Sequence, residues 1–160
     1  MDVIPSKIDF LALMNESLES LRFMYDADQL KSIVDVSGEA PFYTDQSRLL
    51  IIFNNIISNA IRYRNRRKDS FLHIDIHVDY ERVKIIFTDN GIGIANEFQD
   101  KIFKMFFRAS YESKGSGLGL YIVKSTVEKL AGSITVQSEL GEGTRFVIEI
   151  PNTFTPSSMN

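Results

Sequence analysis

The chain has 160 residues, of which 44% are hydrophobic and 24% are charged, a composition typical of one soluble globular domain. Its 18 basic and 21 acidic residues give a net charge of −3, which argues against a nucleic-acid partner. The absence of cysteine excludes disulfides, thiolate nucleophiles and zinc–sulfur sites, and no apolar stretch approaches the ~20 residues that span a bilayer.

The first predicted helix follows a short lead-in. Residues 1–7 show no periodic pattern, and we expect them to be unstructured. From about Ile8 to Tyr25, apolar residues recur every three or four positions, as on the buried face of an amphipathic helix. This stripe is typical of a hydrophobic core rather than of a cofactor site.

Two short strands and a long helix are predicted next. The strands are at 32–37 and 41–44. Asp45 has the position of a helix N-cap, and the helix after it runs to about Tyr63. A polar break follows at 63–70.

The clearest strands lie at 72–79 and 83–89, where apolar and polar residues alternate. Three residues connect them, so the pair is predicted to be antiparallel. Segments 132–138 and 144–150 repeat the alternation around a glycine-bearing turn at 139–143. One sheet face is therefore apolar and the other polar, which predicts an α/β two-layer sandwich with a mixed, mostly antiparallel sheet covered by helices on one face.

Asp89 ends the second of these strands on its apolar side. A carboxylate there requires hydrogen-bond partners, because burying it without them is costly. Gly91 and Gly93 follow, and they allow backbone to approach whatever Asp89 holds. An amino group on a planar heterocycle such as adenine would satisfy the carboxylate, but a local turn capped by Asp89 explains the pattern equally well.

A polar row runs along the predicted helix 46–63. Asn55, Asn59 and Arg62 are spaced at i, i+4 and i+7 and so share one stripe. Two amides and a guanidinium in one row can ligate hydrated Mg²⁺ and bind phosphate oxygens. The alternative is a solvated polar face without a ligand.

The segment "GSGLGL" (115–120) opens another helical pattern, in which apolar spacing begins at Leu118. A glycine-rich helix entrance exposes N–H groups that bind anions, and Lys114 adds positive charge. The segment matches neither the Walker A loop nor the dinucleotide-binding fingerprint. His73 and His77 belong to the polar side of their strand, so we expect both on the solvated sheet face.

Together these motifs resemble the catalytic and ATP-binding domain of sensor histidine kinases, which belongs to a superfamily shared with type II topoisomerases and heat-shock chaperones. Five segments follow the family's order: "NNIISNAIRY" (54–63), "DNGIGI" (89–94), "IFKMFFRA" (102–109), "GSGLGL" (115–120) and "GEGTRF" (141–146). The resemblance implies the Bergerat fold over residues 8–151. The polar segment after it, 152–160, is expected to be a disordered tail.

The resemblance also implies roles for individual residues. Asp89 would accept a hydrogen bond from the adenine amino group, with Thr144 near that contact through a bridging water. Asn55 would coordinate Mg²⁺ and, with Arg62 and Arg108, form the catalytic set. The other residues expected to contact ATP are Asn59, Tyr63, Gly91, Gly93, Ile94, Lys114, Gly115, Gly117, Leu118 and Gly119.

Two details refine this expectation. True ATP hydrolases of the superfamily carry a glutamate where Asn55 stands, and an amide cannot activate water as a general base. The chain is therefore expected to keep ATP intact until a side chain attacks it. The segment 109–114 is predicted to be the core of a short lid over the phosphates.

The implied activity is transfer of the γ-phosphoryl group of ATP to a histidine on a separate dimerisation domain, which then serves a response regulator. No segment here matches that domain, so we expect either an excised domain or a stand-alone relative, monomeric and cytoplasmic. Membrane attachment of a parent protein stays open. The alternatives are a serine kinase resembling the anti-sigma factors and a non-catalytic interaction module gated by nucleotide.

Overall fold

The computed structural model describes residues 2–24, 26–108 and 117–155. The helices within these ranges are α1 (Phe10–Leu21), α2 (Gln46–Arg62) and α3 (Gly119–Lys129), with short 3₁₀ turns η1 (Ala27–Gln29) and η2 (Asn96–Phe98). The strands are β1 (Pro5–Lys7), β2 (Leu30–Ser37), β3 (Tyr43–Asp45), β4 (Ser70–Val78), β5 (Arg82–Asp89), β6 (Ser133–Glu139) and β7 (Gly143–Pro151). No helix in the described part of the chain is long and apolar enough to cross a membrane.

Five strands form the main sheet in the order β2-β4-β5-β7-β6. β2 and β4 are parallel, and every other neighbouring pair is antiparallel, including the predicted hairpins β4–β5 and β6–β7. The prediction of a mixed, mostly antiparallel sheet is therefore confirmed. The β5–β7 register places Asp89 directly opposite Thr144, which brings these two residues together at one end of the sheet.

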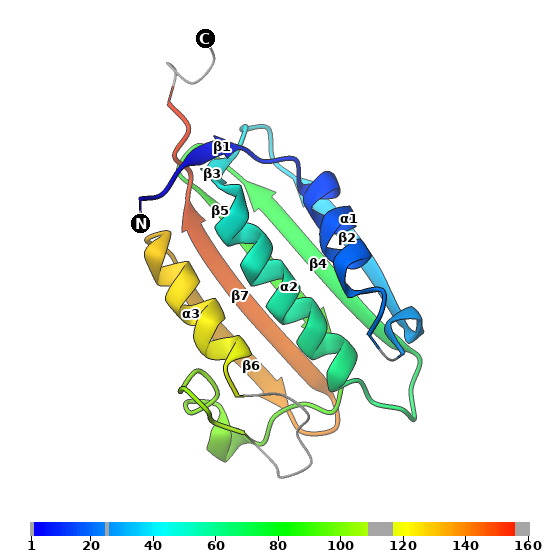
Figure 1. Ribbon diagram of the computed structural model, residues 1–160. Helices are drawn as coiled ribbons and strands as arrows, with labels where there is room; N and C mark the ends of the chain where they lie inside the picture. The colour runs from blue at the N-terminus through cyan, green and yellow to red at the C-terminus, as the bar shows by residue number, and fades with distance from the viewer. Residues whose placement is uncertain (1, 25, 109–116, 156–160) are drawn as a thin grey trace.

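All three α-helices cover the same face of the main sheet, and the other face is left open (Figure 1). The alternation in β4 puts Leu72, Ile74 and Ile76 under the helices, where each is at most 1% exposed. On α2, the helical spacing of apolar residues produces the facing surface, which includes Leu49 and Phe53. The predicted two-layer sandwich is thus confirmed, with its core between the helices and the sheet.

The helix boundaries follow from local capping. Asp9 caps α1, because its Oδ1 accepts a hydrogen bond from the N–H of Ala12 at 3.1 Å. Asp45 caps α2, as predicted, and accepts from the N–H of Arg48 at 3.1 Å. α1 ends at Leu21, earlier than predicted, because the chain then turns into η1.

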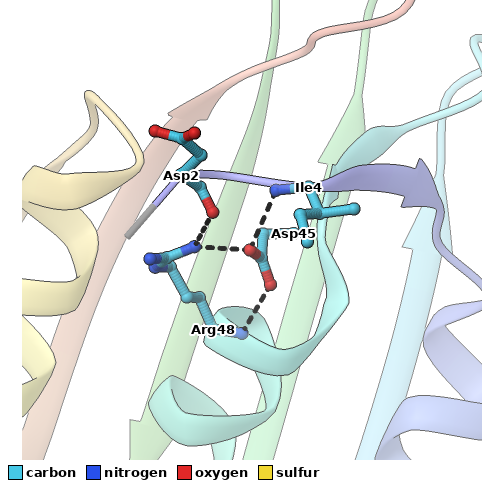
Figure 2. Close-up of polar contacts among 4 residues, drawn as sticks. All are labelled: Asp2, Ile4, Asp45 and Arg48. Atoms are coloured by element: carbon cyan, nitrogen blue, oxygen red, sulfur yellow. Dashed lines mark hydrogen bonds and ion pairs between the residues drawn. The ribbon is translucent and has the colours of Figure 1, made fainter.

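The expectation that residues 1–7 are unstructured is wrong for residues 5–7. Pro5–Lys7 form β1, which pairs antiparallel with β3 in a small separate sheet. The N–H of Ile4 donates to Asp45 Oδ2 at 3.2 Å, and Arg48 Nη1 donates to the carbonyl oxygen of Asp2 at 3.3 Å (Figure 2). Partners about 40 residues away hold this segment, and local periodicity does not reveal them.

The expected disordered tail at 152–160 is also wrong at its beginning. The side chain of Asn152 accepts from the N–H of Tyr43 and donates to the carbonyl oxygens of Pro41 and Asp79. The ring of Phe154 lies 5.7 Å from that of Tyr43 between centroids. One amide therefore joins three segments, and the domain extends beyond residue 151. Residues 156–160 lie outside the described ranges.

Candidate functional site

A pocket is lined by residues from the end of α2, the segment 90–108, the start of α3, the end of β5 and the start of β7. These segments meet at the lower end of the molecule in Figure 1. Its polar lining residues are Asn59, Tyr63, Asp89, Arg108 and Thr144. The rest of the lining is Ile92, Gly93, Ile94, Ile102, Phe107, Gly117, Leu120 and Phe146. Apolar walls with a few polar groups are typical of a small-molecule site.

Asp89 is the acidic residue of this pocket. Its Oδ1 accepts hydrogen bonds from the N–H of Gly91 at 2.9 Å and from the N–H of Thr144 at 3.2 Å. Burial raises the pKa of Asp89 above its ordinary value, and the two hydrogen bonds only partly oppose this. Both bonds engage Oδ1, and no other described residue donates to Oδ2. Oδ2 is therefore the oxygen that can accept from a bound molecule.

Glycines allow the close packing around Asp89. A Cβ atom at Gly91 would lie 2.6 Å from the carbonyl oxygen of Tyr63 and 3.0 Å from Asp89 Oδ1. Gly143 has φ +130°, and a Cβ there would overlap the carbonyl oxygen of Asp89. These glycines hold the carboxylate by admitting protein backbone, a reason that adds to the approach of a ligand expected from the sequence.

The polar row on α2 forms one side of the site. Asn59 and Tyr63 line the pocket, and Arg62 Nη1 donates to Asn59 Oδ1 at 3.4 Å. Asn55 lies one turn earlier, and its Nδ2 donates to the carbonyl oxygen of Ile51 at 2.8 Å. This bond directs its Oδ1 toward α3, where a Cβ at Gly119 would lie 3.2 Å from that oxygen.

The start of α3 forms the opposite side. The helix begins at Gly119 with Leu118 as N-cap, and no side chain of the described residues caps it. Gly117 has φ +78°, and its carbonyl oxygen accepts from the N–H of Phe106 at 2.9 Å. The described part of the glycine-rich segment, 117–120, is thus a helix entrance, as predicted. Lys114, Gly115 and the lid predicted at 109–114 lie outside the described residues.

The structure brings most of the predicted site residues into one pocket. Those that line it are Asn59, Tyr63, Asp89, Gly93, Ile94, Arg108, Gly117 and Thr144. Those that lie beside it without lining it are Asn55, Arg62, Gly91, Leu118 and Gly119. Sequence reasoning missed Ile92, Ile102, Phe107, Leu120 and Phe146, although each belongs to one of the five motif segments.

Both histidines alternate along β4 with its buried residues, so they lie on the open face of the sheet, as predicted. His73 Nε2 lies 2.7 Å from Asp35 Oδ2 and 3.3 Å from Asp75 Oδ1. His77 Nδ1 lies 3.0 Å from the hydroxyl oxygen of Ser37. The two side chains therefore have no part in the pocket.

Comparison with known proteins finds a family match over most of the chain. The family described as "Histidine kinase-, DNA gyrase B-, and HSP90-like ATPase" matches residues 44–153. The adaptive-response sensory kinase SasA of Synechococcus elongatus is 33% identical over 150 residues, covering 92% of this chain and 38% of that protein. The sensor-like histidine kinase SenX3 of Mycobacterium tuberculosis is 32% identical over 148 residues, covering 90% and 36%.

Solved structures agree with the fold. The mycobacterial sensor histidine kinase MprB superposes with a TM-score of 0.76 at 26% identity and covers 93% of this chain and 98% of that one. Full-length ShkA in complex with AMPPNP gives a TM-score of 0.80 at 25% identity over 97% of this chain and 32% of that one. The chain spans less than two fifths of the length of the curated relatives SasA and SenX3.

Proposed function

Because the chain belongs to the histidine kinase-, DNA gyrase B- and HSP90-like ATPase family, we propose that its pocket binds ATP with Mg²⁺ for a sensor histidine kinase. The γ-phosphoryl group passes to a histidine on a separate dimerisation domain and then to a response regulator in the cytoplasm. The relatives SasA and SenX3 are sensor kinases, which supports this branch of the family rather than a gyrase-like one.

The carboxylate of Asp89 is the observation that carries the proposal. Its Oδ1 accepts from two backbone N–H groups, and no other described residue donates to Oδ2, which leaves this oxygen for a donor inside apolar walls. The adenine amino group is such a donor, and the flat base fits between apolar side chains such as Ile94 and Phe146. The phosphates then extend toward Arg108 and the start of α3, where cationic charge and the N–H groups of a helix N-terminus favour anions.

Asn55 fits a magnesium ligand. Mg²⁺ prefers oxygen, and the bond from Nδ2 to Ile51 directs the amide oxygen of Asn55 toward the start of α3. When bound, Mg²⁺ would neutralise charge on the phosphates during transfer. Asn59 and Arg62 lie next along the same helix and would contact phosphate oxygens.

The absence of a carboxylate at position 55 determines the fate of ATP. An amide cannot take a proton from water, so Asn55 does not support hydrolysis by a general base. Asn59, Arg62 and Arg108 hold and orient the phosphates, and the attacking group comes from the acceptor histidine. This division of roles fits a kinase that protects ATP until its acceptor arrives.

The test replaces Asp89 with asparagine. Oδ1 of the new amide must still accept from Gly91 and Thr144, so its NH₂ group faces the pocket and opposes the adenine amino group. We expect Kd for a fluorescent ATP analogue to rise at least roughly tenfold, the scale of one hydrogen bond to a charged group.

The matched control is Asp75→Asn, which makes the same substitution on the open face of β4, where the side chain is 49% exposed. Its Kd is expected to equal that of the wild type. Unchanged affinity in Asp89→Asn would show that the pocket does not recognise adenine through this carboxylate.

A further inference from the structure

Ser138, near the end of β6, contacts two walls of the pocket without lining it. Its Oγ accepts a hydrogen bond from the N–H of Ile94 at 2.8 Å and donates to the carbonyl oxygen of Gly143 at 2.8 Å. The same Oγ lies 3.0 Å from Oγ1 of Thr144. Ile94 and Thr144 both line the pocket, so one hydroxyl connects the segment after β5 with the start of β7.

The number of protons decides which atom donates in the Ser138–Thr144 pair. A serine hydroxyl has one proton, and the carbonyl oxygen of Gly143 can only accept it. Ser138 therefore has no proton left for Thr144, and Thr144 must donate its own. The hydroxyl of Thr144 then offers only lone pairs in other directions, so it acts as an acceptor toward the pocket.

We propose that Ser138 is a positioning residue that determines base specificity by fixing the hydroxyl of Thr144 as an acceptor. This inference rests on the proposed function. Thr144 stands opposite Asp89 in the β5–β7 register, so both polar groups at this end of the pocket accept hydrogen bonds. A base with an amino group matches two acceptors, directly or through water. A base with a carbonyl oxygen there places acceptor against acceptor and leaves buried groups unpaired.

A second contact between the same two segments separates the role of the Ser138 hydroxyl from a purely structural role. Gln99 Nε2 donates to the carbonyl oxygen of Ile94 at 3.2 Å and to that of Ser138 at 2.6 Å. Ile94 is therefore held to β6 at its carbonyl as well as at its N–H. Removing only the hydroxyl of Ser138 leaves this connection and the strand pairing in place.

The experiment compares Ser138→Ala with the wild type in binding ATP and inosine triphosphate, whose base has a carbonyl in place of the amino group. Without Ser138 as its acceptor, the hydroxyl of Thr144 is free to donate to a carbonyl on the base. We expect the Kd for inosine triphosphate, divided by the Kd for ATP, to fall about tenfold in the variant, which is the scale of one hydrogen bond. Ser138→Thr, which keeps a hydroxyl, restores the wild-type ratio.

Ser133→Ala is the matched control, since Ser133 is exposed and lies on the same strand with opposite parity. Its ratio is expected to equal that of the wild type. If Ser138→Ala lowers the affinity for both nucleotides equally, or leaves both affinities unchanged, the hydroxyl does not set base specificity and the inference is overturned. If the wild type binds neither nucleotide, the proposed function itself fails, and the inference fails with it.

Discussion

At the scale of single residues, Asp89 is costly to the fold. Burial raises its pKa, with the hydrogen bonds from Gly91 and Thr144 only partly opposing the shift. A raised folded-state pKa means that the folded protein holds the proton more tightly than the unfolded chain does. This group's contribution to stability is therefore full below the ordinary pKa of 3.8 and is lost as pH rises through the folded-state value. At neutral pH the charge is kept at the expense of stability.

Asp89→Asn is accordingly expected to keep or raise the melting temperature at pH 7, although it weakens nucleotide binding. Asparagine retains the acceptor for both N–H groups and removes the buried charge. The difference in melting temperature between variant and wild type is expected to grow as pH rises from 4 to 7. Thermal unfolding followed by circular dichroism at both pH values measures it, with Asp75→Asn as control. A variant that loses stability as pH rises would contradict the stated cost of the charge.

The sequence could predict Asp89, Gly91 and Thr144, but not the contacts of Ser138 and Gly143 around them. Strand alternation alone places its side chain on the apolar side, because the period of two is local. The contacts of Ser138 with Ile94 and of Gly143 with the carbonyl of Asp89 join residues more than 40 positions apart. No local pattern encodes such pairs, so they emerge only when β5, β6 and β7 are assembled.

At the scale of elements, α2 runs from a capped and ion-paired first turn to the pocket. Its last turns carry Asn59 and Arg62 beside the pocket, and its first turn is held by Asp45. Burial raises the pKa of Asp45, but the hydrogen bonds from Ile4 and Arg48, together with the charge of Arg48, outweigh this and lower it. The stabilisation from this group is therefore present above pH 3.8 and lost as pH falls through the lowered folded-state value.

We expect Asp45→Ala to lower the free energy of unfolding by about 3 kcal/mol at pH 7, because it removes a helix cap and leaves a mostly buried guanidinium without its carboxylate. Arg48 Nη1 lies 2.5 Å from Asp45 Oδ2, and the two side chains are 15% and 9% exposed. Urea unfolding at pH 7 and at pH 3 measures the effect, and the difference from the wild type is expected to shrink at pH 3.

The matched control is Asp9→Ala, which removes the N-cap of α1 at an exposed position where no ion pair is formed among the described residues. Its cost is expected to be about 1 kcal/mol, the usual value for a cap. Nucleotide affinity is expected to be unchanged in Asp45→Ala, since the cap is at the end of α2 away from the pocket. Equal costs in the two variants would show that the pair with Arg48 adds nothing.

The elements that the sequence predicted are those with a local signature. β4 and β5 alternate cleanly, and α2 has both an apolar stripe and a capping aspartate. β1 and the segment after Pro151 have neither, because their order comes from partners such as Tyr43 and Asp79 that are distant in sequence. Their prediction required knowledge of the assembled fold.

At the scale of the whole molecule, the sheet separates the pocket from both histidines. The helices cover one face of the sheet (Figure 1). His73 and His77 alternate along β4 with its buried residues, so they lie on the face that the helices leave open. These two are all the histidines of the chain. Because both lie on the other face of the sheet, neither is positioned to receive a phosphoryl group from the pocket of the same molecule. If this domain acts as a kinase, its acceptor histidine must come from a separate domain that reaches the pocket.

The chain incubated with Mg²⁺ and ATP labelled in its γ-phosphate is therefore expected to remain unlabelled. Adding a panel of histidine-bearing dimerisation domains is expected to give label on at least one acceptor, released by acid and stable to alkali, as a phosphohistidine is. The double variant His73→Gln, His77→Gln is the control and is expected to transfer as the wild type does. An acid-stable label would identify a hydroxyl acceptor and a serine kinase. Nucleotide binding without transfer to any acceptor would instead favour an interaction module gated by ATP.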